Sequence, residues 1–111
     1  NDANKFEDSV LDGIGLIPQI ETRYRSTYFG HIFAGGYATG YYSYLWTEVL
    51  EADAFEPFKD NGLFDKDTAD KLRKYIYSSG NSDDLMTQYV RYRGSEPEIG
   101  PLLEKRGLDN F

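Results

Sequence analysis

The hydrophobic positions between residues 65 and 79 follow a helical period. Acidic residues crowd the front of this segment and basic residues lie at its rear, which is the order that the helix dipole favours. The side chains expected to face the interior are Leu72, Tyr75 and Ile76. The segment is therefore predicted to be a helix with one buried face, ended by Ser79 and Gly80.

Two further helices are predicted towards the C-terminus. Ser82 is expected to cap a helix over residues 83–92, because a serine hydroxyl can accept a hydrogen bond from the first free amides of a helix. The side chains of this helix expected to point inward are Leu85, Met86, Tyr89 and Val90. A last helix is predicted from about Ile99 to Arg106, where a basic last turn precedes Gly107.

The first half of the chain is less regular. Apolar residues at helical spacing predict a short amphipathic helix from Asn4 to about Asp12. Residues 14–29 match neither the helical nor the strand period, so they are expected to form an irregular connector. Residues 30–36 are predicted to form a loop, because Gly35 and Gly36 give the backbone unusual freedom.

Helical periodicity returns from about Ala38 to Ala54. A short helix is expected over residues 56–60, with Pro57 in its first turn. No segment shows the alternation of a strand. The sequence therefore predicts an all-α fold of five or six short helices with a loop rich in glycine and tyrosine.

Composition and charge exclude several kinds of site. The 111 residues suit one compact domain or a piece of a larger one. The 12 Lys and Arg against 19 Asp and Glu leave a net charge of −7, which is unfavourable for binding nucleic acid. The chain has no cysteine, so disulfides and thiolate nucleophiles are excluded. Its one histidine, His31, cannot by itself provide a site that needs two.

The compartment is constrained only by composition. The longest uncharged stretch is broken by glycines and polar residues, so no membrane span is expected. Absence of cysteine suits the cytoplasm, with the bacterial periplasm as the alternative. The chain begins at Asn1 rather than Met and shows no signal-peptide pattern, so we expect it to be trimmed.

The candidate chemistry lies between residues 22 and 46. Spacings of four and three are expected to place Tyr37, Tyr41 and Tyr44 on one helix face, where three hydroxyls could donate to a ligand carbonyl. From the spacing alone, core-edge tyrosines with satisfied hydroxyls are the favoured interpretation. His31, beside flexible glycines, could donate to a substrate carbonyl or be an ordinary histidine at a helix boundary. Arg25 could grip a carboxylate or pair with the surplus acids.

Other charged and glycine-rich motifs have simpler interpretations. The aspartates 65, 67 and 70 are interpreted as a charge set at a helix start, because the spacing from Asp60 does not fit a calcium loop. The segment from Gly35 to Gly40 lacks the Lys-Ser/Thr of a phosphate loop, and no G-x-S-x-G elbow occurs. Residues 91–93 are interpreted as a solvated helix end, and Tyr42 and Trp46 as core residues.

Residues 22–46, TRYRSTYFGHIFAGGYATGYYSYLW, resemble a known family, as do EVLEADAFEPF and the C-terminal segment through LLEKRGL. The family is that of zinc metallopeptidases related to thimet oligopeptidase, oligopeptidase A and bacterial peptidyl-dipeptidase. The H-x-F-x-G-G-Y spacing and the LLEKRGL tail are most similar to the peptidyl-dipeptidase branch. The resemblance implies that residues 1–111 are a single helical C-terminal part of a longer catalytic domain.

The resemblance also implies roles for these residues. In this family an H-E-x-x-H helix and a later glutamate hold zinc, and neither occurs here, so the zinc is expected on the missing upstream part. Tyr44 would donate to the substrate carbonyl as it becomes an oxyanion, with His31 and Tyr37 assisting. Tyr41, Arg25 and the hinge formed by Gly35 and Gly36 would position substrate. Short peptides are the implied substrates, and release of C-terminal dipeptides the implied reaction.

Three functions remain open from the sequence. The first is the substrate-binding part of a zinc peptidyl-dipeptidase, inactive without the rest of its domain, or of an oligopeptidase A-like endopeptidase. The second is a non-enzymatic helical module that binds peptides through the Gly/Tyr loop. The third, a nucleic-acid platform of stacked aromatics, is disfavoured by the acidic balance.

Overall fold

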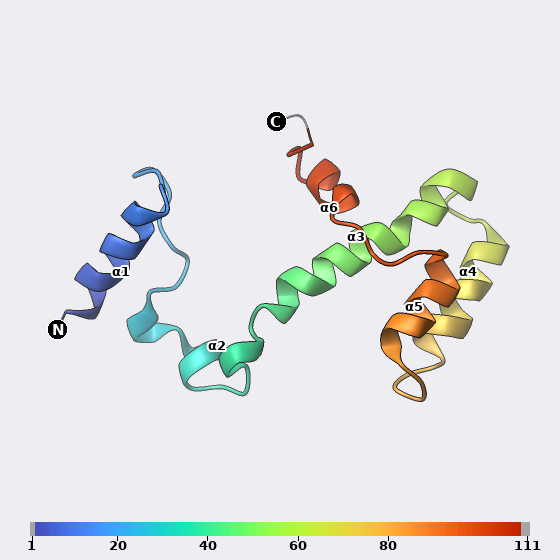
Figure 1. The fold of residues 1–111 in the computed structure, drawn as a ribbon, viewed down its shortest axis with the longest axis horizontal. Coiled ribbons are helices and arrows are strands. Elements are labelled where there is room, and N and C mark those ends of the chain that lie inside the picture. Colours follow the sequence, from blue (N-terminus) through green and yellow to red (C-terminus); the bar gives the residue numbers. More distant parts are fainter. Residues whose placement is uncertain (1, 110–111) are drawn as a thin grey trace. The chain divides into compact units, whose positions relative to one another are not determined.

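The computed structural model describes residues 2–109. Helices and helical turns form all of its regular structure in these residues, with no strand, which confirms the predicted all-α fold (Figure 1). The chain divides into two compact units, Asn1–Tyr42 and Ser43–Phe111. No helix in the described part of the chain is both long and apolar enough to cross a membrane.

The first unit is built around α1 (Ala3–Gly13), followed by the short turns η1 (Ser26–Tyr28), α2 (Gly30–Phe33) and η2 (Ala38–Gly40). The Asp2 carboxylate caps α1 by accepting from the amides of Asn4 and Lys5. Glu7 ties α1 to η1, because its carboxylate accepts from the Ser26 amide and hydroxyl, both at 2.9 Å. These bonds lower the pKa of Glu7, with the Ser26 amide the main cause.

The predicted loop over residues 30–36 is wrong in its first half. α2 forms there because the amides of Ile32 and Phe33 donate to the Phe29 carbonyl, and the Ala34 amide donates to the Gly30 carbonyl at 2.8 Å. The single helix predicted from Ala38 is also wrong at its start. Ala38 has a φ of +29°, outside the helical range, and η2 ends before the long helix begins.

The second unit begins with α3 (Ser43–Asn61), which runs through both the predicted helix ending at Ala54 and the short helix over 56–60. Pro57 lies inside α3 and has no amide to donate to the carbonyl of Asp53. The Nε of Arg93 donates to that carbonyl instead, at 3.1 Å. A side chain from another helix therefore replaces the bond that the proline removes, and the helix continues where the sequence predicted a break.

The remaining helices are α4 (Lys66–Leu72), α5 (Leu85–Arg93) and α6 (Gly100–Lys105), and α4 continues into a π-helical turn, η3 (Arg73–Tyr77). The predicted cap of α5 is wrong: Asp84, rather than Ser82, accepts from the Thr87 amide at 2.8 Å. This bond and one from the Thr87 hydroxyl lower the pKa of Asp84. Asp65 caps α4, which confirms its place at a helix start.

The core of the second unit is small. Val49 and Ala52 of α3 form a buried cluster with Leu102 of α6. Tyr89 and Tyr92 of α5 are also buried. The predicted apolar stripe over α4 and η3 is half-buried; it consists of Leu72, Tyr75 and Ile76. Four residues predicted to be interior are exposed instead: Tyr42, Trp46, Leu85 and Met86.

Candidate functional site

His31 lies in the first unit among three tyrosine rings. Its imidazole centre is 5.9 Å from the ring of Tyr37, 6.0 Å from Tyr41 and 6.3 Å from Tyr24. Tyr37 and Tyr41 also meet edge to face at 6.5 Å. These separations lie within the range in which aromatic rings attract one another. The structure therefore brings together three of the predicted site residues, His31, Tyr37 and Tyr41.

Phe29 packs against two of these tyrosines. The ring of Phe29 stacks on Tyr24 at 5.0 Å and meets the ring of Tyr41 edge to face at 4.8 Å. We call Tyr24, Phe29, His31, Tyr37 and Tyr41 the aromatic cluster. Spacing along a helix could not identify Tyr24 and Phe29, because the contacts cross turns between η1, α2 and η2. The sequence indicated only that both residues lie close to His31: Tyr24 precedes it by seven residues and Phe29 by two.

Exposure divides the aromatic cluster into two layers. Tyr24, Phe29 and Tyr41 are half-buried, whereas His31 and Tyr37 are exposed. Tyr37 retains 41% of its accessible surface. Three rings thus form a base, and one imidazole and one phenol stand above it with access to a ligand.

Tyr44 belongs to the second unit, in the first turn of α3. The prediction that Tyr37, Tyr41 and Tyr44 share one helix face is wrong, because Tyr37 and Tyr41 precede α3 and flank η2. Tyr44 retains 47% of its accessible surface, and its carbonyl accepts from the Thr47 hydroxyl at 2.9 Å. Its side chain is therefore exposed and does not belong to the buried core of the second unit.

The glycines before Tyr37 differ in their surroundings. A Cβ on Gly35 would lie 3.2 Å from the carbonyl oxygen of His31, whereas a Cβ on Gly36 would meet nothing within 4 Å. Gly35 is thus required for the close passage of the chain past His31. The assignment of both glycines to a substrate hinge stays a prediction.

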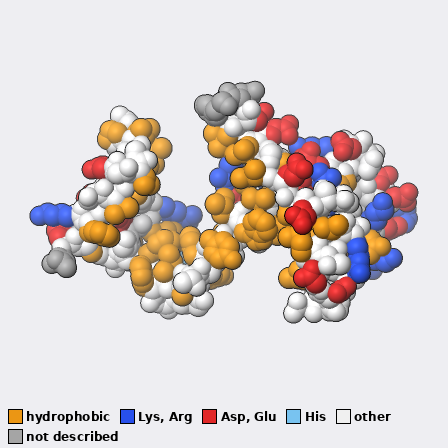
Figure 2. Space-filling view, in the orientation of Figure 1, with side chains coloured by type: hydrophobic (Ala, Val, Ile, Leu, Met, Phe, Trp, Pro, Cys, Tyr) orange, Lys and Arg blue, Asp and Glu red, His pale blue; other side chains and the backbone are white. Residues whose placement is uncertain are grey.

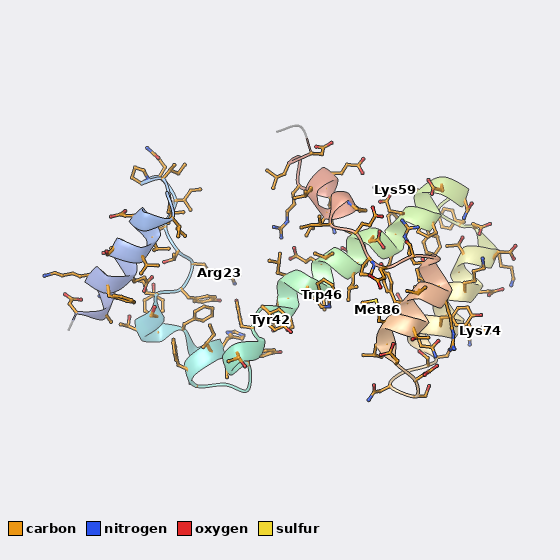
Figure 3. The ribbon with its side chains drawn as sticks, in the orientation of Figure 1. Arg23, Tyr42, Trp46, Lys59, Lys74 and Met86 are labelled. Atoms are coloured by element: carbon orange, nitrogen blue, oxygen red, sulfur yellow. The ribbon has the colours of Figure 1, made fainter. Side chains whose placement is uncertain are left out.

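Arg25 has a partner within its own unit. Its guanidinium donates to the Asp8 carboxylate of α1 at 2.7 Å, and this hydrogen bond is the main cause of its raised pKa. The neighbouring Arg23 lies over the ring of Tyr24, 5.0 Å from its centre (Figure 3). Arg25 therefore helps to join η1 to α1, and its predicted contact with substrate stays a prediction.

Residues 91–93 do not form the solvated helix end that the sequence predicted. Tyr92 is buried, and its hydroxyl donates to the Ala54 carbonyl at 2.6 Å. Arg93 pairs with the fully buried Asp53, whose carboxylate also accepts from the Tyr89 hydroxyl at 2.6 Å. Burial, followed by the bond to Asp53, raises the pKa of Tyr89. This network joins α5 to α3, so its role is structural.

A metal would need ligands that these residues do not supply. Among residues 2–109, no three His, Cys, Asp or Glu side chains are placed to hold a metal ion. Three or four such ligands are the usual requirement of a protein zinc site. The described residues therefore do not fit a zinc ion, and the chemistry they offer is hydrogen-bond donation from phenols and an imidazole.

Comparison with known proteins gives one consistent result. A family model described as "Peptidase family M3" matches residues 4–108. The chain is 46% identical to dipeptidyl carboxypeptidase of Salmonella typhimurium over 95% of its length, and 47% identical to that of Escherichia coli over 97%. It is 49% identical to oligopeptidase A of Escherichia coli over 72% of its length. The chain spans only 16%, 16% and 12% of these curated relatives.

Proposed function

The chain belongs to peptidase family M3, and on that premise we propose that it forms the substrate-binding and oxyanion-stabilising part of a zinc metallopeptidase that hydrolyses short peptides. The family resemblance seen in residues 22–46 is confirmed by the matches to dipeptidyl carboxypeptidase and oligopeptidase A. The observation that carries the proposal is the grouping of His31, Tyr37 and Tyr41 into one aromatic cluster with two exposed donors.

The exposed donors suit the carbonyl groups of a peptide. A phenol donates one hydrogen bond, and an imidazole N–H donates another, so His31 and Tyr37 could hold two backbone carbonyls or one carbonyl from two sides. The half-buried rings beneath them limit their movement, which reduces the reorganisation needed when a substrate binds. Tyr41 lies in the same cluster and would position substrate through its contact with both.

We propose that Tyr44 donates to the reacting carbonyl oxygen as negative charge develops there. Its place in the first turn of α3 and its exposed side chain support this role. The zinc would be held by polypeptide outside the described residues, because those residues do not fit it. When bound there, it would supply an activated water for attack on the peptide bond.

Release of C-terminal dipeptides is the reaction that we favour. The two dipeptidyl carboxypeptidases are 46% and 47% identical over 95% and 97% of the chain, whereas oligopeptidase A of Haemophilus influenzae, which also matches most of the chain, is 41% identical over 92%. Mass spectrometry of the products from peptides of known sequence tests this choice. Successive loss of two residues from the C-terminus supports dipeptide release, and cleavage at internal bonds supports the oligopeptidase alternative.

The role of Tyr44 is tested by Tyr44→Phe in the full-length protein. Because a removed oxyanion donor costs on the order of 100- to 1000-fold in rate, we expect kcat to fall by that factor while KM changes little. Tyr42→Phe is the matched control, since Tyr42 lies two residues away and is 71% exposed. Equal kcat values for Tyr44→Phe and the control would exclude Tyr44 from this role.

A non-enzymatic peptide-binding module is the alternative function. It predicts that the 111 residues bind peptides without any metal, and that the full-length protein releases no products. Hydrolysis by the full-length protein that depends on a metal would exclude this alternative.

A further inference from the structure

We propose that Phe29 is a positioning residue that holds His31 in the orientation needed to bind substrate; this rests on the function proposed above. Phe29 touches two of the three tyrosines around the imidazole, Tyr24 at 5.0 Å and Tyr41 at 4.8 Å. Those two tyrosines in turn lie 6.3 Å and 6.0 Å from His31. Phe29 thus acts on His31 through its neighbours.

The backbone of Phe29 contributes a second constraint. Its carbonyl accepts from the amides of Ile32 and Phe33, at 3.1 Å and 3.0 Å, and these bonds form the single turn of α2 that carries His31. A turn of four residues has little stability of its own, because helix formation needs a longer run to offset nucleation. Side-chain packing by Phe29 is therefore what can fix the orientation of α2 and of His31.

The layering of the aromatic cluster explains why this position suits phenylalanine. The base of Tyr24, Phe29 and Tyr41 is half-buried, and Phe29 lies between the other two rings. A benzyl ring can make both the stacked contact with Tyr24 and the edge-to-face contact with Tyr41. An aliphatic side chain of similar size would fill the space without setting the angle between the two phenols.

The test is Phe29→Leu in the full-length protein, with Phe33→Leu as control. Phe33 lies in the same turn but is 71% exposed. Because a misplacement of about 1 Å can cost 100-fold in rate, we expect Phe29→Leu to lower kcat/KM by about 10- to 100-fold and the control by less than about 2-fold. Phe29→Tyr keeps the ring and should retain activity close to that of the parent.

A double-mutant cycle with His31→Gln distinguishes positioning from a general loss of structure. If Phe29 acts through His31, Phe29→Leu should cause little further loss in the His31→Gln background. An equal loss in both backgrounds, or no loss from Phe29→Leu alone, would overturn the role of Phe29 while leaving that of His31 intact. If His31→Gln alone left kcat/KM unchanged, the proposed role of His31 would fail, and that of Phe29 with it.

A folding defect would be recognised separately. The melting temperature of each variant should stay close to that of the parent, because Phe29 is only half-buried. If Phe29→Leu does not fold, Phe29→Met and the same cycle replace it, since methionine is also apolar and lacks the ring. Full activity of Phe29→Met would then count against the proposal.

Discussion

The small size of Gly35 allows the chain to pass close to the carbonyl oxygen of His31. A Cβ at Gly35 would lie 3.2 Å from the His31 carbonyl oxygen and 3.5 Å from that of Gly30, and both contacts are to backbone. The backbone of α2 must therefore shift by a few tenths of an ångström to admit an alanine. Since catalysis depends steeply on donor placement, we expect Gly35→Ala to lower kcat/KM by roughly 3- to 10-fold.

Gly36→Ala provides the comparison for this prediction, because a Cβ there meets nothing within 4 Å. Steady-state kinetics of both variants in the full-length protein measure the difference. Equal activities for the two alanine variants would show that close passage past His31 does not matter for function.

The site residues were predictable from the sequence only in part. The motif around His31, Tyr37 and Tyr41 identified the residues that the structure brings together. The expected arrangement, in which the tyrosines share one helix face, was wrong. The turn η2 and the positive φ of Ala38 interrupt the helix between Tyr37 and Tyr44. Phe29 and Tyr24 were missed because their contacts depend on how three turns fold together, which periodicity does not report.

At the scale of elements, α3 shows how a helix can continue through a proline. The Asp53 carbonyl, deprived of a backbone donor by Pro57, accepts from Arg93 of α5. The same guanidinium donates to the Asp53 carboxylate at 3.2 Å and 3.3 Å. A lysine cannot reproduce this planar arrangement of donors, so we expect Arg93→Lys to destabilise the contact between α3 and α5 by about 1–3 kcal/mol.

Pro57→Ala should recover part of that loss. An alanine restores an amide that can donate to the Asp53 carbonyl, so it replaces one of the bonds that Arg93→Lys removes. Hydrogen exchange of the α3 amides in the full-length protein measures both changes. Arg91→Lys is the matched control, because Arg91 pairs with Asp83 at an exposed position. The account is wrong if Arg93→Lys costs no more than this control, or if Pro57→Ala recovers nothing in the double variant.

Helices with strong end signals were the best predicted elements. Asp65 caps α4 at the predicted helix start, and Gly107 follows α6 with a positive φ of 67°. The errors have two causes, a contact from another helix and a misplaced helix start. Arg93 compensates for Pro57, and Asp84 takes the capping position expected for Ser82 because it lies directly before the first turn of α5. Local patterns report a segment's own preferences and omit such compensation.

At the scale of the whole molecule, apolar side chains are exposed on both units (Figure 2). Among the described residues of the first unit, none is buried, although Phe6, Ile14 and Phe33 are large and apolar. In the second unit, Phe64 and Tyr77 are likewise exposed. Exposed apolar surface of this extent is typical of surfaces that other polypeptide covers. This agrees with the small share of its relatives' length that the chain spans.

The last prediction is that the peptidase activity of the full-length protein depends on a metal ion. Residues 2–109 contain no cluster of His, Cys, Asp or Glu that could hold a metal ion. In the function proposed above, this chain would supply the donors to a peptide, and other polypeptide would supply the metal site. We expect the full-length protein to lose its peptidase activity when a chelator removes metal, and to regain it when zinc is restored. The 111 residues alone should show no hydrolysis even in added zinc, because no cluster within residues 2–109 can bind it catalytically. Hydrolysis by the 111 residues in zinc, or unchanged activity of the metal-free full-length protein, would contradict this division of the site. Peptide binding by the metal-free protein, weakened by Tyr37→Phe, would support it, since the aromatic cluster needs no metal to hold a substrate carbonyl.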